Sequence, residues 1–156
     1  KLGNAVVSTS GPRLNTQAVL ASGSGTKYFF GSLWVGKFGT FASDEEVMLI
    51  NQKTGEYCFR TITEVSSSYV VVNSAPTNSP DFIVQIPHFN TLAVNAGVTI
   101  QGRYIAFRCK GNCVVNGRLV PSGTGVARTD SLTVTHAGLI DRFLCGVDLQ
   151  SFKRRV

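Results

Sequence analysis

Apolar and polar residues alternate along most of the chain. The run YCFRTITEV at 57–65 changes polarity at nearly every step, and NTLAVNAGVTIQG at 90–102 does so on both sides of a glycine. No window of eleven or more residues carries apolar residues at helical spacing between helix caps, and valine, threonine, isoleucine and phenylalanine dominate. Because the side chains of a strand point alternately to its two faces, these patterns predict an all-β protein.

The predicted strands are short and separated by residues that favour turns. KTG at 53–55 and SSS at 66–68 suit tight turns, so the segment 51–80 is predicted to be an antiparallel insert, which Pro76 and Pro80 end. The first seven strands are predicted at residues 18–20, 27–30, 33–35, 47–51, 56–65, 69–73 and 82–86.

A repeat marks the second half of the chain. Similar patterns, each a valine in a strand followed within a few residues by glycine, are spaced by 21 and then 19 residues. Such a period is typical of β-solenoids, in which each strand pairs with its equivalent one coil away and glycine turns the corners. We therefore expect a short parallel β-solenoid with an antiparallel hairpin insert, with a β-sandwich of the jelly-roll type as the alternative. The repeated pairs are Val94 with Gly97, Val115 with Gly117, and Val134 with Gly138.

Residues 47–123 resemble a known class of β proteins. The pattern L-x-V-x-x-G-x-x-I at 92–100 and V-V-N-G-x-L at 114–119 follow a VMLI strand and a hairpin. This arrangement resembles the first coils of parallel β-helix domains in bacterial surface proteins and in phage tail or virion proteins. The resemblance implies a structural role, with ends that are capped, fused to a neighbour or used in oligomeric contacts.

The length of 156 residues suits one β domain. We expect residues 1–26 to be a flexible leading segment, residues 27–86 to hold strands with the antiparallel insert, and residues 87–156 to form the solenoid-like coils. The chain opens at Lys1, which indicates a processed product or a piece of a longer chain.

The distribution of charged residues limits the classes of binding partner that the sequence favours. The chain has 15 Lys and Arg against 9 Asp and Glu, but the basic residues are scattered singly, except at 153–155, and aromatic residues do not alternate with them. This pattern does not favour nucleic-acid binding. No apolar run reaches the ~20 residues that cross a bilayer, so no membrane span is expected.

Candidates for metal or cofactor chemistry are sparse. Cys109 and Cys113, with His136 and Cys145 downstream, form only a weak zinc motif, because the spacer has three residues and the downstream partners are single. Cys58 stands apart. We therefore expect no metal and no cofactor, and we expect the cysteines to be small buried residues in strands.

Candidates for catalysis are no stronger. The contiguous acidic residues 44–46 suit a solvated turn, and neither His88 nor His136 has a neighbouring nucleophile motif. We therefore expect no enzymatic activity. A polysaccharide-degrading enzyme remains a further alternative, and its acid and base would be sought among Asp130, Asp141 and Asp148.

Aromatic residues crowd the segment YFFGSLWVGKFGTF at 28–41. They either cover the first end of the stack or form a contact surface for another subunit. The candidate contact residues are Tyr28, Trp34, Phe38 and Phe41.

These observations predict a structural or assembly module of a phage virion, of the tail-fibre, tailspike or head-decoration type. Its partners would be copies of itself, as a trimer by analogy, and other virion or surface proteins. The alternative is a bacterial surface adhesin or carbohydrate-binding module that binds glycan through Trp34 or its neighbours. The expected location is the virion or the cell surface.

Overall fold

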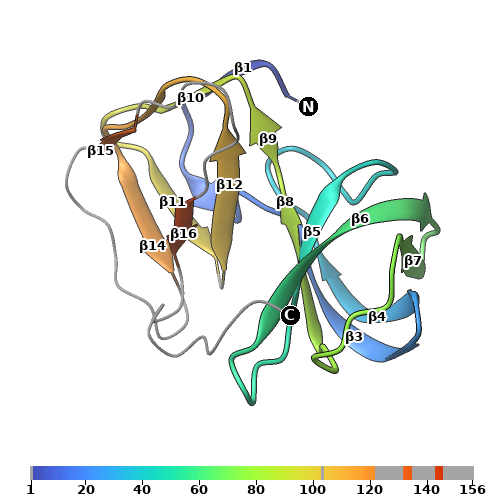
Figure 1. Cartoon of the computed structure of the whole chain (residues 1–156). Coiled ribbons are helices and arrows are strands. Elements are labelled where there is room, and N and C mark those ends of the chain that lie inside the picture. Colours follow the sequence, from blue (N-terminus) through green and yellow to red (C-terminus); the bar gives the residue numbers. More distant parts are fainter. Residues whose placement is uncertain (1, 103, 122–131, 135–142, 146–156) are drawn as a thin grey trace. The chain divides into compact units, whose positions relative to one another are not determined.

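The computed structural model describes residues 2–102, 104–121, 132–134 and 143–145 (Figure 1). These residues form strands joined by turns and loops, which confirms the all-β prediction. Within these ranges no helix is long and apolar enough to cross a membrane. The chain divides into two compact units, one of residues 1–15 and 87–149 and the other of residues 16–86 and 150–156.

The unit that begins at Thr16 is a closed six-strand barrel, in which every strand is antiparallel to its neighbours. The circle closes where β3 pairs with β8 as well as with β4 (Figure 1). Around the barrel the order is β3 (Gln17–Ser24), β4 (Lys27–Trp34), β7 (Tyr69–Val72), β6 (Tyr57–Val65), β5 (Glu46–Ile50) and β8 (Phe82–Ile86).

This barrel overturns the predicted fold. The main sheet is a closed antiparallel barrel, so the expectation of a parallel β-solenoid with a hairpin insert is wrong, and the barrel is not a two-sheet sandwich either. The antiparallel pairing of β6 with β7 across the serine turn was predicted and is confirmed. The closure was missed because alternating side chains serve a barrel and a solenoid equally well.

The inside of the barrel is filled by its own side chains, as expected for a barrel of few strands. Leu20, Phe30 and Leu33 pack against the buried cluster from its margin. The cluster consists of Ala18, Tyr28, Phe41, Val47, Leu49, Cys58, Ile62, Val70, Val72 and Ile83.

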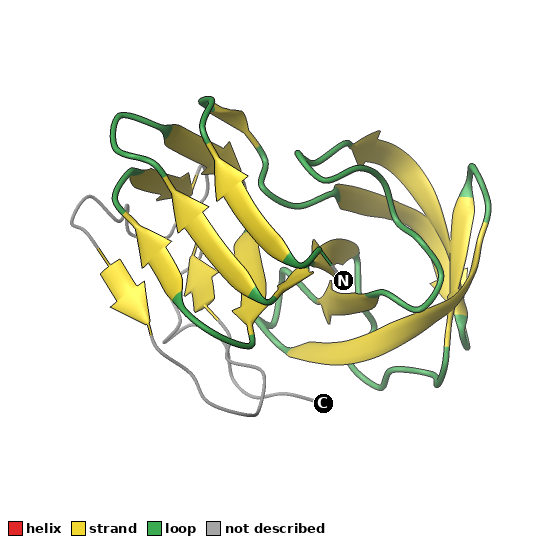
Figure 2. Ribbon diagram, turned by 90° about the horizontal axis from the view of Figure 1, so that it is seen from above, coloured by secondary structure: helices red, strands yellow, loops and turns green. Residues whose placement is uncertain are grey.

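The other unit contains three sets of parallel strands, seen from above in Figure 2. Each set pairs segments that are far apart in the sequence. The first set is β1 (Asn4–Val7), β10 (Thr91–Val94) and β13 (Cys113–Val115); the second is β2 (Gly11–Pro12), β11 (Thr99–Gly102) and β14 (Arg118–Pro121); the third is β9 (His88–Phe89) and β12 (Ile105–Cys109).

The register of this unit explains two members of the sequence repeat. Val94 lies opposite Val115 in the parallel pair of β10 and β13. The third member does not continue the series, because β15 (Leu132–Val134) runs antiparallel to β13 and places Leu132 opposite Val115. Likewise β16 (Phe143–Cys145) is antiparallel to β12, and Gly138 lies outside the described residues.

The predicted leading segment is part of both units. Residues 4–24 contain β1, β2 and β3. Between β2 and β3, the side chain of Asn15 forms two hydrogen bonds with the backbone of Ala106. Its Nδ2 donates to the Ala106 carbonyl oxygen at 2.5 Å, and its Oδ1 accepts from the Ala106 amide at 3.4 Å. The buried amide of Asn15 therefore satisfies both backbone groups of Ala106, as a strand residue would.

Candidate interaction surface

The outer side of β4 and β7 carries two aromatic residues and one cation. Tyr28 and Val70 lie opposite each other and face the barrel core, so their neighbours in sequence face outward. Phe29 lies directly opposite Tyr69, and Lys27 is two residues away on the same side of β4. We call Lys27, Phe29 and Tyr69 the aromatic face.

The three side chains of the aromatic face contact one another. The ring centroids of Phe29 and Tyr69 are 5.4 Å apart with 56° between the ring planes. The Lys27 Nζ lies 4.1 Å from the Tyr69 centroid and 5.4 Å from the Phe29 centroid, within the range of cation–π attraction. Phe29 is 37% exposed despite its size. The face therefore presents apolar ring surface beside one positive charge.

The four predicted contact residues are not part of the aromatic face. Tyr28 and Phe41 are buried in the barrel core, each 4% exposed. Trp34 and Phe38 are half-buried, and the Trp34 ring packs edge-on against Phe82 at 5.8 Å. Most of the aromatic run 28–41 therefore packs within the barrel unit.

Phe29 and Tyr69 were not singled out from the sequence. A signal was available, because a strand that buries Tyr28 and Phe30 must expose the residue between them. The six aromatic residues of 28–41, taken as one cluster, do not show which rings face outward, because that depends on the two faces of the strand.

The predicted acidic turn at 44–46 holds a loop in place. Glu45 Oε1 accepts from the Ala42 amide at 2.7 Å, and Glu45 Oε2 accepts from Gln85 Nε2 at 2.9 Å. Gln85 is buried in β8, and its Oε1 accepts from the Thr16 amide at 3.0 Å. The two carboxylate oxygens of Glu45 thus have structural partners, one in the loop between β4 and β5 and one in β8.

The remaining catalytic candidates do not form a group in the described part of the chain. Asp130, Asp141, Asp148 and His136 lie outside the described residues. His88 lies in β9 opposite Arg108.

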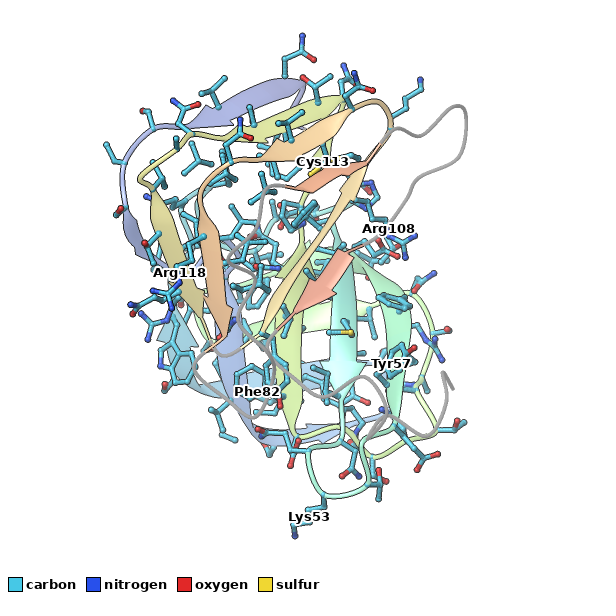
Figure 3. All side chains as sticks on the ribbon, turned by 90° about the vertical axis from the view of Figure 1, so that its left-hand side faces the viewer. Lys53, Tyr57, Phe82, Arg108, Cys113 and Arg118 are labelled. Atoms are coloured by element: carbon cyan, nitrogen blue, oxygen red, sulfur yellow. The ribbon has the colours of Figure 1, made fainter. Side chains whose placement is uncertain are left out.

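The cysteines with described side chains are buried and unbridged. They are Cys58 in the barrel and Cys109 and Cys113 in the other unit, where Cys113 is labelled in Figure 3. Among the described residues no three His, Cys, Asp or Glu side chains are grouped to hold a metal ion. The side chain of Cys145 is outside the described set.

Two ionisable groups in the barrel have shifted pKa values. Burial raises the pKa of the Cys58 thiol above its usual range, while the Arg60 guanidinium partly opposes that shift. Burial, followed by the nearby Cys58, raises the pKa of Tyr28, and Arg60 again opposes it. Both groups therefore stay neutral in the folded barrel at ordinary pH.

The described basic residues outside the aromatic face are dispersed on turns, loops and strands. Figure 3 shows Lys53 at the tip of the turn between β5 and β6, and Arg118 projects outward from β14. Arg60 is used within the barrel, where its Nε donates to the Ser74 carbonyl oxygen at 3.1 Å.

No protein-family model, no curated protein and no solved structure matches this chain. The function must therefore be argued from the surface of the molecule. Of the surfaces described above, the aromatic face combines exposed ring area, a cation and a rigid two-strand support, so it is the candidate interaction surface.

Proposed function

We propose that the chain is a structural module that acts through protein–protein contacts, as a component of a phage virion of the tail-fibre, tailspike or head-decoration type. Copies of the chain associate with one another, and the aromatic face is the contact surface. The module works in the virion or at a cell surface and carries out no chemical reaction.

One observation carries this proposal: Phe29 is exposed beside Tyr69 on two paired strands whose other side is anchored in the barrel core. Tyr and Phe are enriched at protein interfaces, where a rigid ring contributes contact area at little cost in conformational entropy. Lys27 is compatible with such a contact because its ammonium already lies over the two rings.

The filled interior of the barrel supports the same proposal. The core cluster occupies the inside of the closed sheet, so contacts with other molecules are made on the outer surface. The buried amide of Gln85 and the half-buried carboxylate of Glu45 hold the loop between β4 and β5 in place.

The virion setting rests on the resemblance of residues 47–123 to phage and surface proteins. The barrel accounts for residues 47–86 of that stretch, so this half lends no support to the resemblance. The two motifs at 92–100 and 114–119 include strands that do pair in parallel.

The aromatic face is tested by removing its rings. In a chain carrying both Phe29→Ser and Tyr69→Ser, we expect a lower solution mass by light scattering than in the wild type at equal concentration. The matched control is Val35→Ser, which removes an apolar side chain that is 57% exposed outside the face. Equal masses for wild type and the double variant would remove the aromatic face from the proposal.

Glycan binding is the second candidate function, because an exposed ring can also stack against the apolar side of a sugar. The exposure of Phe29 beside Tyr69 favours it. This alternative predicts a single chain in solution that is retained on a glycan array, and loss of retention in the Phe29→Ser variant.

A further inference from the structure

We propose that β1 pairs antiparallel with β1 of a second copy of this chain, around a two-fold axis at Ala5. The proposal rests on the self-association proposed above but uses a different surface, in the unit that carries the parallel strands. It names the partner and the register of one contact.

Strand β1 is the outer strand of its sheet, whose order is β1, β10, β13, β15. At the opposite side of that sheet β15 covers β13, and in the third strand set β16 likewise covers β12. Within the described ranges, no strand pairs with the outer side of β1. The barrel has no such side, because its sheet is closed.

The backbone of β1 directs alternate residues toward that open side. The carbonyl oxygens of Gly3 and Val7 accept from the amides of Asn90 and Asn95 next to β10. Because backbone groups alternate in direction along a strand, Ala5 also faces β10, and the amides and carbonyls of Asn4 and Val6 face the open side.

Within the described residues, β1 lacks several of the usual protections of an outer strand. Proteins block such strands with charged side chains, proline, bulges or a covering segment. Residues 2–12, LGNAVVSTSGP, contain no charged residue, and the only proline lies in β2. The pairing of β1 with β10 is regular over all four residues, and Val6 is 64% exposed. This strand is therefore open to pairing.

A second copy fits this strand better than a charged partner does. The chain carries a net charge of +6, so the repulsion between two copies is smallest where the surfaces that meet carry no charge. Strand β1 is uncharged and regular, and an antiparallel pair of identical strands is self-complementary around a two-fold axis.

The direction of the backbone groups fixes the register. With the axis at Ala5, Asn4 of one copy lies opposite Val6 of the second copy, and these outward-facing residues exchange hydrogen bonds. The two Ala5 residues form the closer, non-hydrogen-bonded pair, which their small side chains permit. The exposed Val6 side chain then lies beside Asn4 of the second copy.

Paired charges at Asn4 and Val6 test this register. Asn4→Lys with Val6→Lys places like charges opposite each other across the axis, whereas Asn4→Lys with Val6→Glu places opposite charges there. We expect roughly tenfold weaker self-association in the Lys/Lys variant at low salt, and undiminished, salt-sensitive association in the Lys/Glu variant. Both residues are exposed, so the fold should be retained, and circular dichroism checks this.

The control carries the same added charge elsewhere in the same unit, through Gln101→Lys with Asn116→Lys at two exposed positions. Its association should exceed that of the Lys/Lys variant. Equal weakening in the Lys/Lys, Lys/Glu and control variants would overturn the proposed register.

The variant lacking both rings of the aromatic face separates the two proposals. If it remains a dimer that the Lys/Lys change disrupts, the β1 contact is supported. If association is lost on removing the rings but unchanged in the Lys/Lys variant, the β1 contact is wrong and the aromatic face stands. A wild-type chain that stays single at every concentration contradicts both.

Discussion

The ring of Tyr28 occupies the space that a side chain at Gly23 would need. The two residues lie opposite each other in β3 and β4, and a Cβ atom at Gly23 would lie 2.0 Å from Cδ1 of Tyr28. The Tyr28 hydroxyl donates to the Gly25 carbonyl oxygen at 3.0 Å. Tyr28 is thus held toward the core, and this orientation turns Phe29 outward onto the aromatic face.

Substitution of Gly23 should therefore destabilise the barrel. We expect Gly23→Ala to lower the free energy of unfolding by about 1–3 kcal/mol, because the Tyr28 ring must move. The matched control is Gly31→Ala in β4, where the nearest atom would lie at 3.4 Å, in ordinary contact. Chemical denaturation measures both variants, and an equal effect at the two glycines would show that the ring is not the cause.

The side-chain amide of Asn15 should stabilise the folded unit that contains it. Asn15→Leu keeps a similar volume but leaves the buried amide and carbonyl of Ala106 without their side-chain partner, at a cost of about 1–3 kcal/mol for each group. Equilibrium denaturation gives the value. Asn116→Leu, at an exposed asparagine of the same unit, should change stability little. A neutral Asn15→Leu variant would mean that these hydrogen bonds contribute nothing net.

Alanine substitution at two glycines in the turns around β13 should lower stability to different extents. A Cβ atom at Gly117 would lie 2.3 Å from the Val98 carbonyl oxygen, whereas one at Gly111 would lie 2.9 Å from the Asn90 carbonyl oxygen. We expect both alanine variants to lower the thermal midpoint, Gly117→Ala by more, because its backbone neighbour must move further. The reverse order would argue that these turns adapt freely.

The buried thiol of Cys58 should make barrel stability fall at alkaline pH. Its folded pKa is raised above the unfolded value, so its contribution is complete below about pH 8.5, where an unfolded thiol titrates, and is lost as the pH rises through the folded pKa. Denaturation from pH 7 to pH 10 should give a shallower decline for Cys58→Ala than for wild type. Identical slopes would contradict this assignment.

Local structure was predicted from sequence better than closure was. Strand β8 was predicted at 82–86 and found there, and Val94 and Val115, 21 residues apart, do lie opposite each other in parallel strands. The pairing of β3 with β8 joins segments more than sixty residues apart, and alternation within each strand holds no information about such partners. The sequence pattern around Val134 likewise did not indicate whether that strand runs parallel or antiparallel to its neighbour.

The candidate site was predicted only as a region. The aromatic run 28–41 was expected either to cover the stack or to contact another subunit, and Tyr28 and Phe41 lie in the barrel core. Phe29 lies in the same run, but its ring partner Tyr69 is forty residues away and meets it only through the pairing of β4 with β7. Assigning alternate residues of each of the two strands to the inner and outer faces of the sheet would have indicated that both rings face outward.

The most direct test of the proposed assembly role is the solution mass of the intact chain, measured by light scattering over a dilution series. The proposal predicts a mass above that of one chain, falling only when the aromatic face or the β1 contact is altered. A single chain at every concentration, retained on a glycan array through Phe29, would contradict the assembly role and favour a glycan-binding module.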